Sequence, residues 1–139
     1  MRVFFDTNVL VYLFDEDAPA KQERARQVLQ EAVDAGRIVL STQVLQEFYV
    51  AVTQKLERPV DPELAEQAVQ SLTRLPVLPV DSPMILGAVR LARRHTLSLW
   101  DALIVESALA ASASQLLTED LQAGRRFDEL EIVNPFSSL

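Results

Sequence analysis

Short apolar runs alternate along the chain with longer stretches in which apolar residues recur every three or four positions. The short runs predict buried strands, and the longer spacing predicts helices with one face toward a core. Strands are predicted at residues 2–6, 37–40, 75–80, 115–118 and 131–133. Helices are predicted at residues 7–14, 20–35, 42–55, from 62 onward, 82–95 and 99–111. Strands separated by helices indicate an α/β fold with a mostly parallel sheet covered on both faces.

Residues with strong local preferences mark the ends of several of these elements. Asp61 and Ser98 occupy N-cap positions, where a side-chain oxygen satisfies free backbone N–H groups. Gly36 closes the helix that precedes it. Pro76 and Pro79 interrupt the third apolar run, so we expect a short strand at an edge of the sheet.

Four acidic residues stand where carboxylates are hard to explain structurally. Asp6 ends the first predicted strand and Asp120 follows the fourth, at the edge where open α/β sheets place ligands. Glu47 and Asp101 interrupt the apolar faces of two helices, so we expect Glu47 to point toward the core. A lone buried carboxylate is costly. One divalent-cation site lined by oxygen atoms accounts for all four positions.

Three of the four acids, all except Glu47, also have an ordinary structural interpretation. Asp6 can be the N-cap of the short helix after it. Asp101 lies three residues after Ser98 and can bond back to this cap, as in a variant capping box. Glu119 and Asp120 can belong to a plain turn. These alternatives remain open for each residue, but they require four separate explanations where a shared metal site requires one.

Composition narrows the class of protein. With 139 residues, of which 49% are hydrophobic, the chain has the length and apolar content of one domain, residues 1–139. It has no cysteine and one histidine, His95, which excludes thiol chemistry and a pair of imidazoles. The three glycines form no nucleotide-binding loop. After these exclusions, the reaction class that suits the acidic residues is metal-activated hydrolysis of a phosphodiester. No apolar run near the start is long enough to span a bilayer, so we expect a cytoplasmic protein with no membrane contact.

The net charge of −7 argues at first against a nucleic-acid partner, because cations drive phosphate binding. Bound metal ions would cancel part of this charge. Arginine forks suit phosphate oxygens, and arginines cluster at Arg90, Arg93 and Arg94 and at Arg125 and Arg126. These clusters are either RNA phosphate contacts or solvated faces, and both interpretations are kept.

Four segments together resemble the successive signatures of PIN domains, and in particular the VapC-type toxins of toxin–antitoxin pairs. They are residues 5–12 with the sequence FDTNVLVY, Ser41 with Glu47-Phe48, residues 99–104 with LWDALI, and residues 117–121 with LTEDL. The resemblance covers nearly the whole chain, and the segments occur in the order of the family.

The resemblance implies a three-layer α/β/α sandwich and an endoribonuclease that depends on Mg²⁺ or Mn²⁺. Carried over position by position, it implies a catalytic, metal-binding quartet and two polar helpers. The quartet is Asp6, Glu47, Asp101 and Asp120, and the helpers are Asn8 and Thr118. Glu119 either contributes through water or faces solvent, and we interpret it as a solvent-facing neighbour.

The resemblance further implies a homodimer, an RNA substrate such as transfer RNA, and a cognate antitoxin whose basic tail fills the acidic groove. One alternative is a catalytically silent module that keeps the fold and binds a basic protein partner. A phosphoacceptor receiver domain fits poorly, because it needs a late lysine and the chain has only Lys21 and Lys55. A DNA-directed or flap nuclease would need additional elements for which the chain has little room.

Overall fold

The computed structural model describes all residues from Met1 to Leu139. Its centre is a six-stranded sheet with the order β3-β2-β1-β4-β6-β5. All pairings are parallel except that of β5 with β6. The strands are β1 Arg2–Phe5, β2 Ile38–Ser41, β3 Val77–Leu78, β4 Ala113–Leu117, β5 Arg126–Phe127 and β6 Leu130–Val133. The predicted mostly parallel sheet is therefore confirmed.

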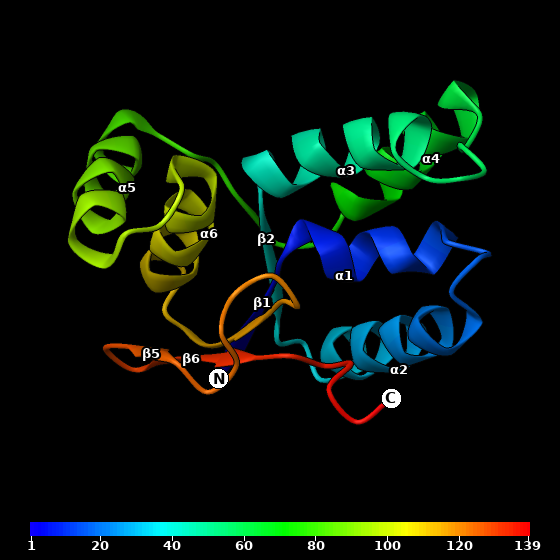
Figure 1. The fold of residues 1–139 in the computed structure, drawn as a ribbon. Coiled ribbons are helices and arrows are strands. Elements are labelled where there is room, and N and C mark those ends of the chain that lie inside the picture. The colour runs from blue at the N-terminus through cyan, green and yellow to red at the C-terminus, as the bar shows by residue number, and fades with distance from the viewer.

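Helices cover both faces of this sheet (Figure 1). The connections from β1 to β2 and from β2 to β3 run in one direction, so right-handed crossovers place their helices on one face. The connection from β3 back to β4 runs in the opposite direction and places α5 and α6 on the other face. The helices are α1 Thr7–Val11, α2 Pro19–Asp34, α3 Thr42–Gln54, α4 Pro62–Leu72, α5 Ser82–His95 and α6 Leu99–Ala110. A 3-10 turn, Tyr12–Phe14, continues α1. This α/β/α architecture confirms the predicted fold class, and none of the helices has the length and apolar character needed to cross a membrane.

The sequence pattern missed one strand, β5. It has only two residues, and it forms a hairpin with β6 in which Phe127 pairs with Leu130. Asp128 makes the turn with a φ of 53°. The asparagine-glycine or aspartate-glycine pairs typical of such turns are absent here, so the sequence contains no strong hairpin signal.

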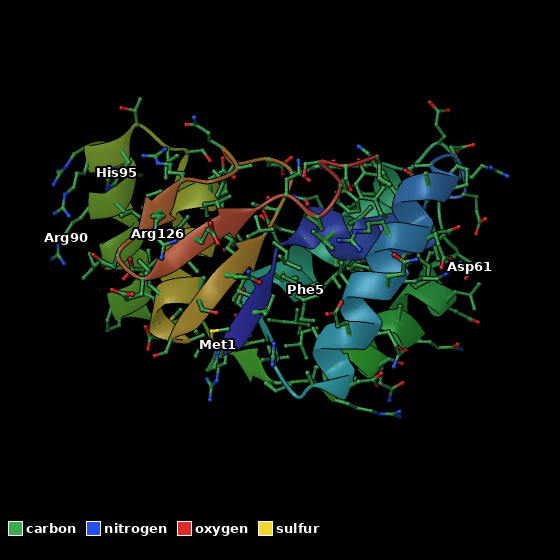
Figure 2. All side chains as sticks on the ribbon, turned by 90° about the horizontal axis from the view of Figure 1, so that it is seen from below. Met1, Phe5, Asp61, Arg90, His95 and Arg126 are labelled. Carbon is green, nitrogen blue, oxygen red and sulfur yellow. The ribbon has the colours of Figure 1, made fainter.

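The central strands are anchored by side chains that are completely buried. Phe4 and Phe5 on β1, Leu40 on β2 and Leu116 on β4 all have no exposed surface. Each such side chain contributes about 1.5–3 kcal/mol through burial. Figure 2 shows Phe5 inside the molecule, with Arg90, His95 and Arg126 together at one end and Asp61 toward the other. The core therefore holds the strand ends in fixed positions.

The order in which the strands are added to the sheet reverses between β1 and β4. Open α/β sheets form their ligand sites at such a switch point, outside the carboxyl ends of the strands. Phe5 pairs with Leu117 as the last residue of each strand. The Asp6 backbone N–H then donates to the Leu117 carbonyl at 3.0 Å. The residues that follow both strands, Asp6 and Thr118, are thereby placed side by side.

Candidate active site

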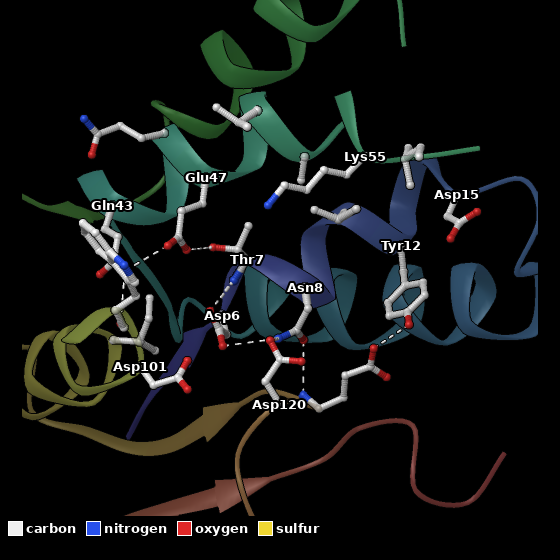
Figure 3. A pocket seen from close by; sticks show the side chains of 18 residues that line it. Asp6, Thr7, Asn8, Tyr12, Asp15, Gln43, Glu47, Lys55, Asp101 and Asp120 are labelled. Carbon is white, nitrogen blue, oxygen red and sulfur yellow. Dashed lines mark hydrogen bonds between the residues drawn. The ribbon is translucent and has the colours of Figure 1, made fainter. Parts of the chain in front are cut away.

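A groove of about 840 Å³ opens at the carboxyl edge of the sheet, among α1, α3, the start of α6 and the loop after β4. Figure 3 shows side chains from these four segments pointing into it. Six of the residues singled out from the sequence line the groove: Asp6, Asn8, Glu47, Asp101, Glu119 and Asp120. Acids up to 114 positions apart in the sequence (6 to 120) therefore meet in one place.

Asp6 is the most enclosed of these acids, with 5% of its surface exposed. Its Oδ1 accepts a hydrogen bond from the Thr7 backbone N–H at 2.7 Å, so Asp6 is the N-cap of α1. Its Oδ2 accepts from the Thr118 hydroxyl at 2.8 Å and from Asn8 Nδ2 at 3.3 Å. The capping interpretation is correct, and the same carboxylate also faces the groove.

Asn8 joins the ends of β1 and β4. Its Nδ2 lies 3.0 Å from both Thr118 Oγ1 and Asp120 Oδ2, and its Oδ1 accepts from the Glu119 backbone N–H at 3.2 Å. Thr118 is buried below the groove, and its hydroxyl also accepts from the Asp120 backbone N–H at 3.1 Å. Asp120 itself is exposed, so these bonds fix the position of a loop carboxylate that packing does not hold.

Glu47 was predicted to point toward the core, but its half-buried side chain faces the groove. The Thr7 hydroxyl donates to its Oε1 at 2.8 Å, and Gln43 Nε2 donates to its Oε2 at 3.1 Å. Hydrogen bonds from α1 and from the preceding turn of α3 therefore replace the water that a carboxylate would otherwise need. The apolar face on which Glu47 lies continues into the core at Phe48, which is 1% exposed.

Asp101 lies in the first turn of α6, and its backbone N–H donates to the Ser98 hydroxyl at 3.1 Å. Ser98 therefore caps the helix as expected, through the main chain of Asp101. The carboxylate lines the groove and is half-buried. Burial raises the pKa of Asp101, and the carboxylates of Asp120 and Glu47 raise it further.

Glu119 does not face solvent as the sequence interpretation expected. The Lys21 ammonium forms a salt bridge with its Oε2 at 2.9 Å, and the Tyr12 hydroxyl donates to its Oε1. Lys21 also lies over the Tyr12 ring, 4.9 Å from the centroid, and the bond to Glu119 raises the pKa of Lys21. The cause of the error is that both partners come from segments about a hundred residues away, which local pattern cannot reveal.

None of the five arginines proposed from the sequence as phosphate contacts lines the groove. Arg90, Arg93 and Arg94 surround a separate surface depression. Arg125 lies 3.1 Å from His95 Nδ1 and packs over the ring of Phe127. Arg126 is 3.9 Å from Glu131. Contact between these side chains and RNA stays a prediction, and it would occur outside the groove.

The donor set suits a hard divalent cation such as Mg²⁺ or Mn²⁺, which favours carboxylate and water ligands. Burial raises the pKa of Asp6 to about 7, and the hydrogen bonds from Thr118 and Thr7 lower it only in part. A bound cation would favour the ionised carboxylate. No three acids lie close enough together to form a ready-made cage. This spacing suits an ion that keeps several waters and contacts one or two carboxylates directly, as Mg²⁺ usually does.

The sequence profile of the PIN domain matches residues 3–130 of the chain. The chain belongs to the PIN domain family. Among curated proteins, no significant sequence match is found. The region that matches the family profile contains all four of the predicted metal-binding acids that line the groove.

Solved structures similar to this PIN domain include several toxin–antitoxin proteins. A toxin–antitoxin complex from Klebsiella pneumoniae superimposes with a TM-score of 0.72 at 19% identity, covering 96% of this chain and 98% of that chain. DNA-bound VapBC from Salmonella typhimurium gives 0.65 at 22% identity, with 95% and 96% covered. VapC20 from Mycobacterium tuberculosis, a toxin that cleaves the sarcin–ricin loop, gives 0.63 at 18% identity, with 82% and 86% covered. At these identities the likeness establishes the shared fold.

Sequence reasoning missed several residues that hold the groove acids of this PIN domain in place. Thr7 and Gln43 hold Glu47, and Tyr12 with Lys21 holds Glu119. Gln43 had a usable signal, because it lies four positions before Glu47 on the same helix face. Its Oε1 is buried without a hydrogen-bond partner, an acceptor of the kind that an ordered water satisfies.

Replacing Asn8 by alanine is expected to lower both stability and any activity of the site. The change removes the amide that joins Asp6, Thr118 and Asp120, and it leaves the Glu119 backbone N–H without its acceptor. We expect a loss of about 1–3 kcal/mol in the free energy of unfolding, measured by urea denaturation. Gln30→Ala, on the exposed face of α2, is the control, because it removes a side-chain amide that bonds only to Asp34. Equal effects of the two changes would contradict a special role of Asn8.

Proposed function

We propose that this PIN domain is an endoribonuclease that depends on Mg²⁺ or Mn²⁺ and acts as the toxin of a toxin–antitoxin pair. The observation that carries the proposal is the convergence of four carboxylates, from four separate segments, on one open groove. Burial penalises the ionised forms of Asp6 and Asp101, and the neighbouring carboxylates repel them further; a bound cation would offset both effects. Perturbed carboxyl groups in a cleft are typical of functional sites.

The proposed roles follow the positions of the side chains. Asp6, Glu47 and Asp101 would hold the metal directly or through water, and Asp120 would complete the site or assist a second ion. When bound, such an ion lowers the pKa of a water and neutralises charge on the leaving oxygen of a phosphodiester. Thr7, Gln43, Asn8 and Thr118 keep the carboxylates in place through the hydrogen bonds described above.

The proposed partners are RNA, a cognate antitoxin and a second copy of the chain. The acidic groove and the net charge of −7 suit an antitoxin segment with basic side chains. Similar structures were solved as toxin–antitoxin complexes, and one similar toxin cleaves the sarcin–ricin loop. A structured RNA such as transfer RNA, acted on in the cytoplasm, is the proposed substrate.

Cleavage of a mixed pool of small RNAs by the purified, antitoxin-free protein tests the proposal. We expect fragments with Mn²⁺ or Mg²⁺ and none with a chelator, because the acids alone cannot activate water. Restoring the metal after chelation should restore cleavage. Gel or sequencing analysis of fragment ends provides the measurement.

The absence of cleavage with either metal, by protein shown to be folded, would contradict the nuclease proposal and favour the silent binding module. Cleavage that persists in chelator would contradict metal dependence. The Asp101→Asn variant serves to detect a contaminating nuclease. Cleavage that belongs to this chain should be lost in the variant, whereas cleavage by a contaminant should persist.

A further inference from the structure

One aromatic ring on the wall of the groove is left exposed. Trp100, the only tryptophan of the chain, lines the groove and has 62% of its surface exposed. Its backbone is nevertheless held firmly, because Gln43 Nε2 donates to its carbonyl at 3.1 Å and Ser98 caps its helix. A fixed main chain carrying an open indole provides a flat apolar surface for a ligand with a planar face.

One cation faces the same groove. Lys55 directly follows α3 and is the only lysine or arginine among the residues that line the groove. Figure 3 shows its ammonium group directed into the groove. No carboxylate lies within salt-bridge distance of it, whereas Lys21 is paired with Glu119, and Arg58, close by in the sequence, with Asp17. The position at a helix C-terminus explains a lysine there, but it does not explain an unpaired ammonium beside a set of acids.

Trp100 and Lys55 are associated with opposite ends of α3. Gln43, in the first turn of this helix, contacts Trp100, and Lys55 follows its last turn. The twelve steps from position 43 to position 55 correspond to about 18 Å along the helix axis. Glu47 lies between them. An extended ligand along α3 would therefore meet an aromatic surface, then the acidic centre, then a cation.

We infer that Trp100 stacks on an unpaired base of the RNA in the groove and that Lys55 binds one of its backbone phosphates. The inference rests on the proposed function and deepens it by naming two side chains that contact the substrate. Bases within a duplex are already stacked on their neighbours, so only an unpaired base can lie on an indole. A basic peptide segment would match the acids alone, whereas a nucleic-acid strand supplies both a planar base for Trp100 and a phosphate for Lys55.

Tryptophan fluorescence tests the stacking directly, because the signal comes from Trp100 alone. The protein would carry Asp6→Asn, a variant that we expect to be unable to cleave RNA, and would be titrated in Mg²⁺ with an unstructured RNA oligonucleotide. We expect the RNA to quench the fluorescence, and the same strand annealed to its complement to quench it far less. Equal quenching by the duplex, or no quenching by an RNA that binds, would overturn the inference.

Paired substitutions test the two contacts in the same background, with the anisotropy of labelled RNA as the readout. Trp100→Ala should weaken binding about tenfold, and Trp100→Phe should retain most of the affinity. Lys55→Gln should weaken binding and reduce the slope of log K against log salt by about 0.7, the value for one phosphate contact on a single strand. Lys55→Arg should restore the slope.

Failure of this inference is distinguishable from failure of the proposed function. If the wild-type protein cleaves RNA, but Trp100→Ala and Lys55→Gln bind and cleave like it, the nuclease stands and the assigned RNA contacts are wrong. If Trp100→Ala instead weakens only the binding of a protein partner, the exposed ring belongs to a protein interface, which also overturns the inference. Thermal unfolding of each variant, compared with the parent, shows that the fold is intact.

Discussion

Asp101→Asn is expected to reduce RNA cleavage by about a hundredfold or more while leaving the fold intact, which corresponds to at least about 2.7 kcal/mol of lost transition-state stabilisation. Asparagine has nearly the same shape as aspartate but lacks the charge that a hard cation requires. The cap of α6 survives, because the backbone N–H of residue 101 keeps its hydrogen bond to the Ser98 hydroxyl. Initial cleavage rates in Mn²⁺, together with a thermal melt, provide the measurement.

Glu106→Gln is the matched control for this substitution. Glu106 lies on the same helix as Asp101 and is absent from the groove, so the same loss of charge should leave cleavage unchanged. A folded Asp101→Asn variant that cleaves at the wild-type rate would remove Asp101 from the proposed site. Loss of folding in this variant would instead favour a structural role for the carboxylate.

The metal-free protein is expected to lose stability as the pH rises from about 4 to about 8, because of Asp6. Burial raises the pKa of this carboxyl group from 3.8 to about 7 in the folded chain. A group with a raised folded pKa stabilises the fold fully below its unfolded pKa, and this contribution disappears as the pH rises through the folded value. The shift of about three units corresponds to about 4 kcal/mol in the free energy of unfolding.

Urea denaturation across this pH range, with and without Mn²⁺, measures the effect. The difference between wild type and Asp6→Asn isolates the contribution of Asp6 from those of the other acids. We expect the variant to be the more stable protein at high pH without metal, and to be unable to cleave RNA. Its gain should be smaller than the full ~4 kcal/mol, because its amide nitrogen cannot accept the bond from the Thr118 hydroxyl.

Manganese should reverse the loss of stability at high pH in the wild type, because an ion that binds only the folded protein stabilises it by mass action. Asp34→Asn, on the exposed end of α2, is the control and should follow the wild-type profile. Wild-type stability that rises relative to Asp6→Asn between about pH 5 and about pH 8 would contradict the expected sign.

The two arginine groups show that a sequence reveals clusters of charge but not their distance from a site. Arg90, Arg93 and Arg94 share one helix, and Arg125 and Arg126 are adjacent, so their clustering is visible in the sequence. Their distance from the acids depends on the path of α5 and of the β5–β6 hairpin, neither of which local pattern determines. Lys55 shows the converse, since nothing in its neighbours distinguishes it, yet it faces the groove.

The sequence by itself determined the elements and the positions of the acids in them. Apolar periodicity depends on neighbours within a few residues, so it located every helix and every strand except β5. The short edge strand expected within residues 75–80 is β3, Val77–Leu78. It also placed Asp6 and Asp120 after parallel strands, whose carboxyl ends share one edge. The capping roles of Asp6 and Ser98 are equally local and were predicted for the same reason.

Only the tertiary structure decided which side chains meet across the groove. Glu119 pairs with Lys21 and Tyr12, and Glu47 bonds Thr7, because chain segments distant in sequence pack against one another. The raised pKa of Asp6 likewise depends on burial by the whole fold. Such contacts arise from the packing of complete layers, which the order of residues within any one segment does not specify.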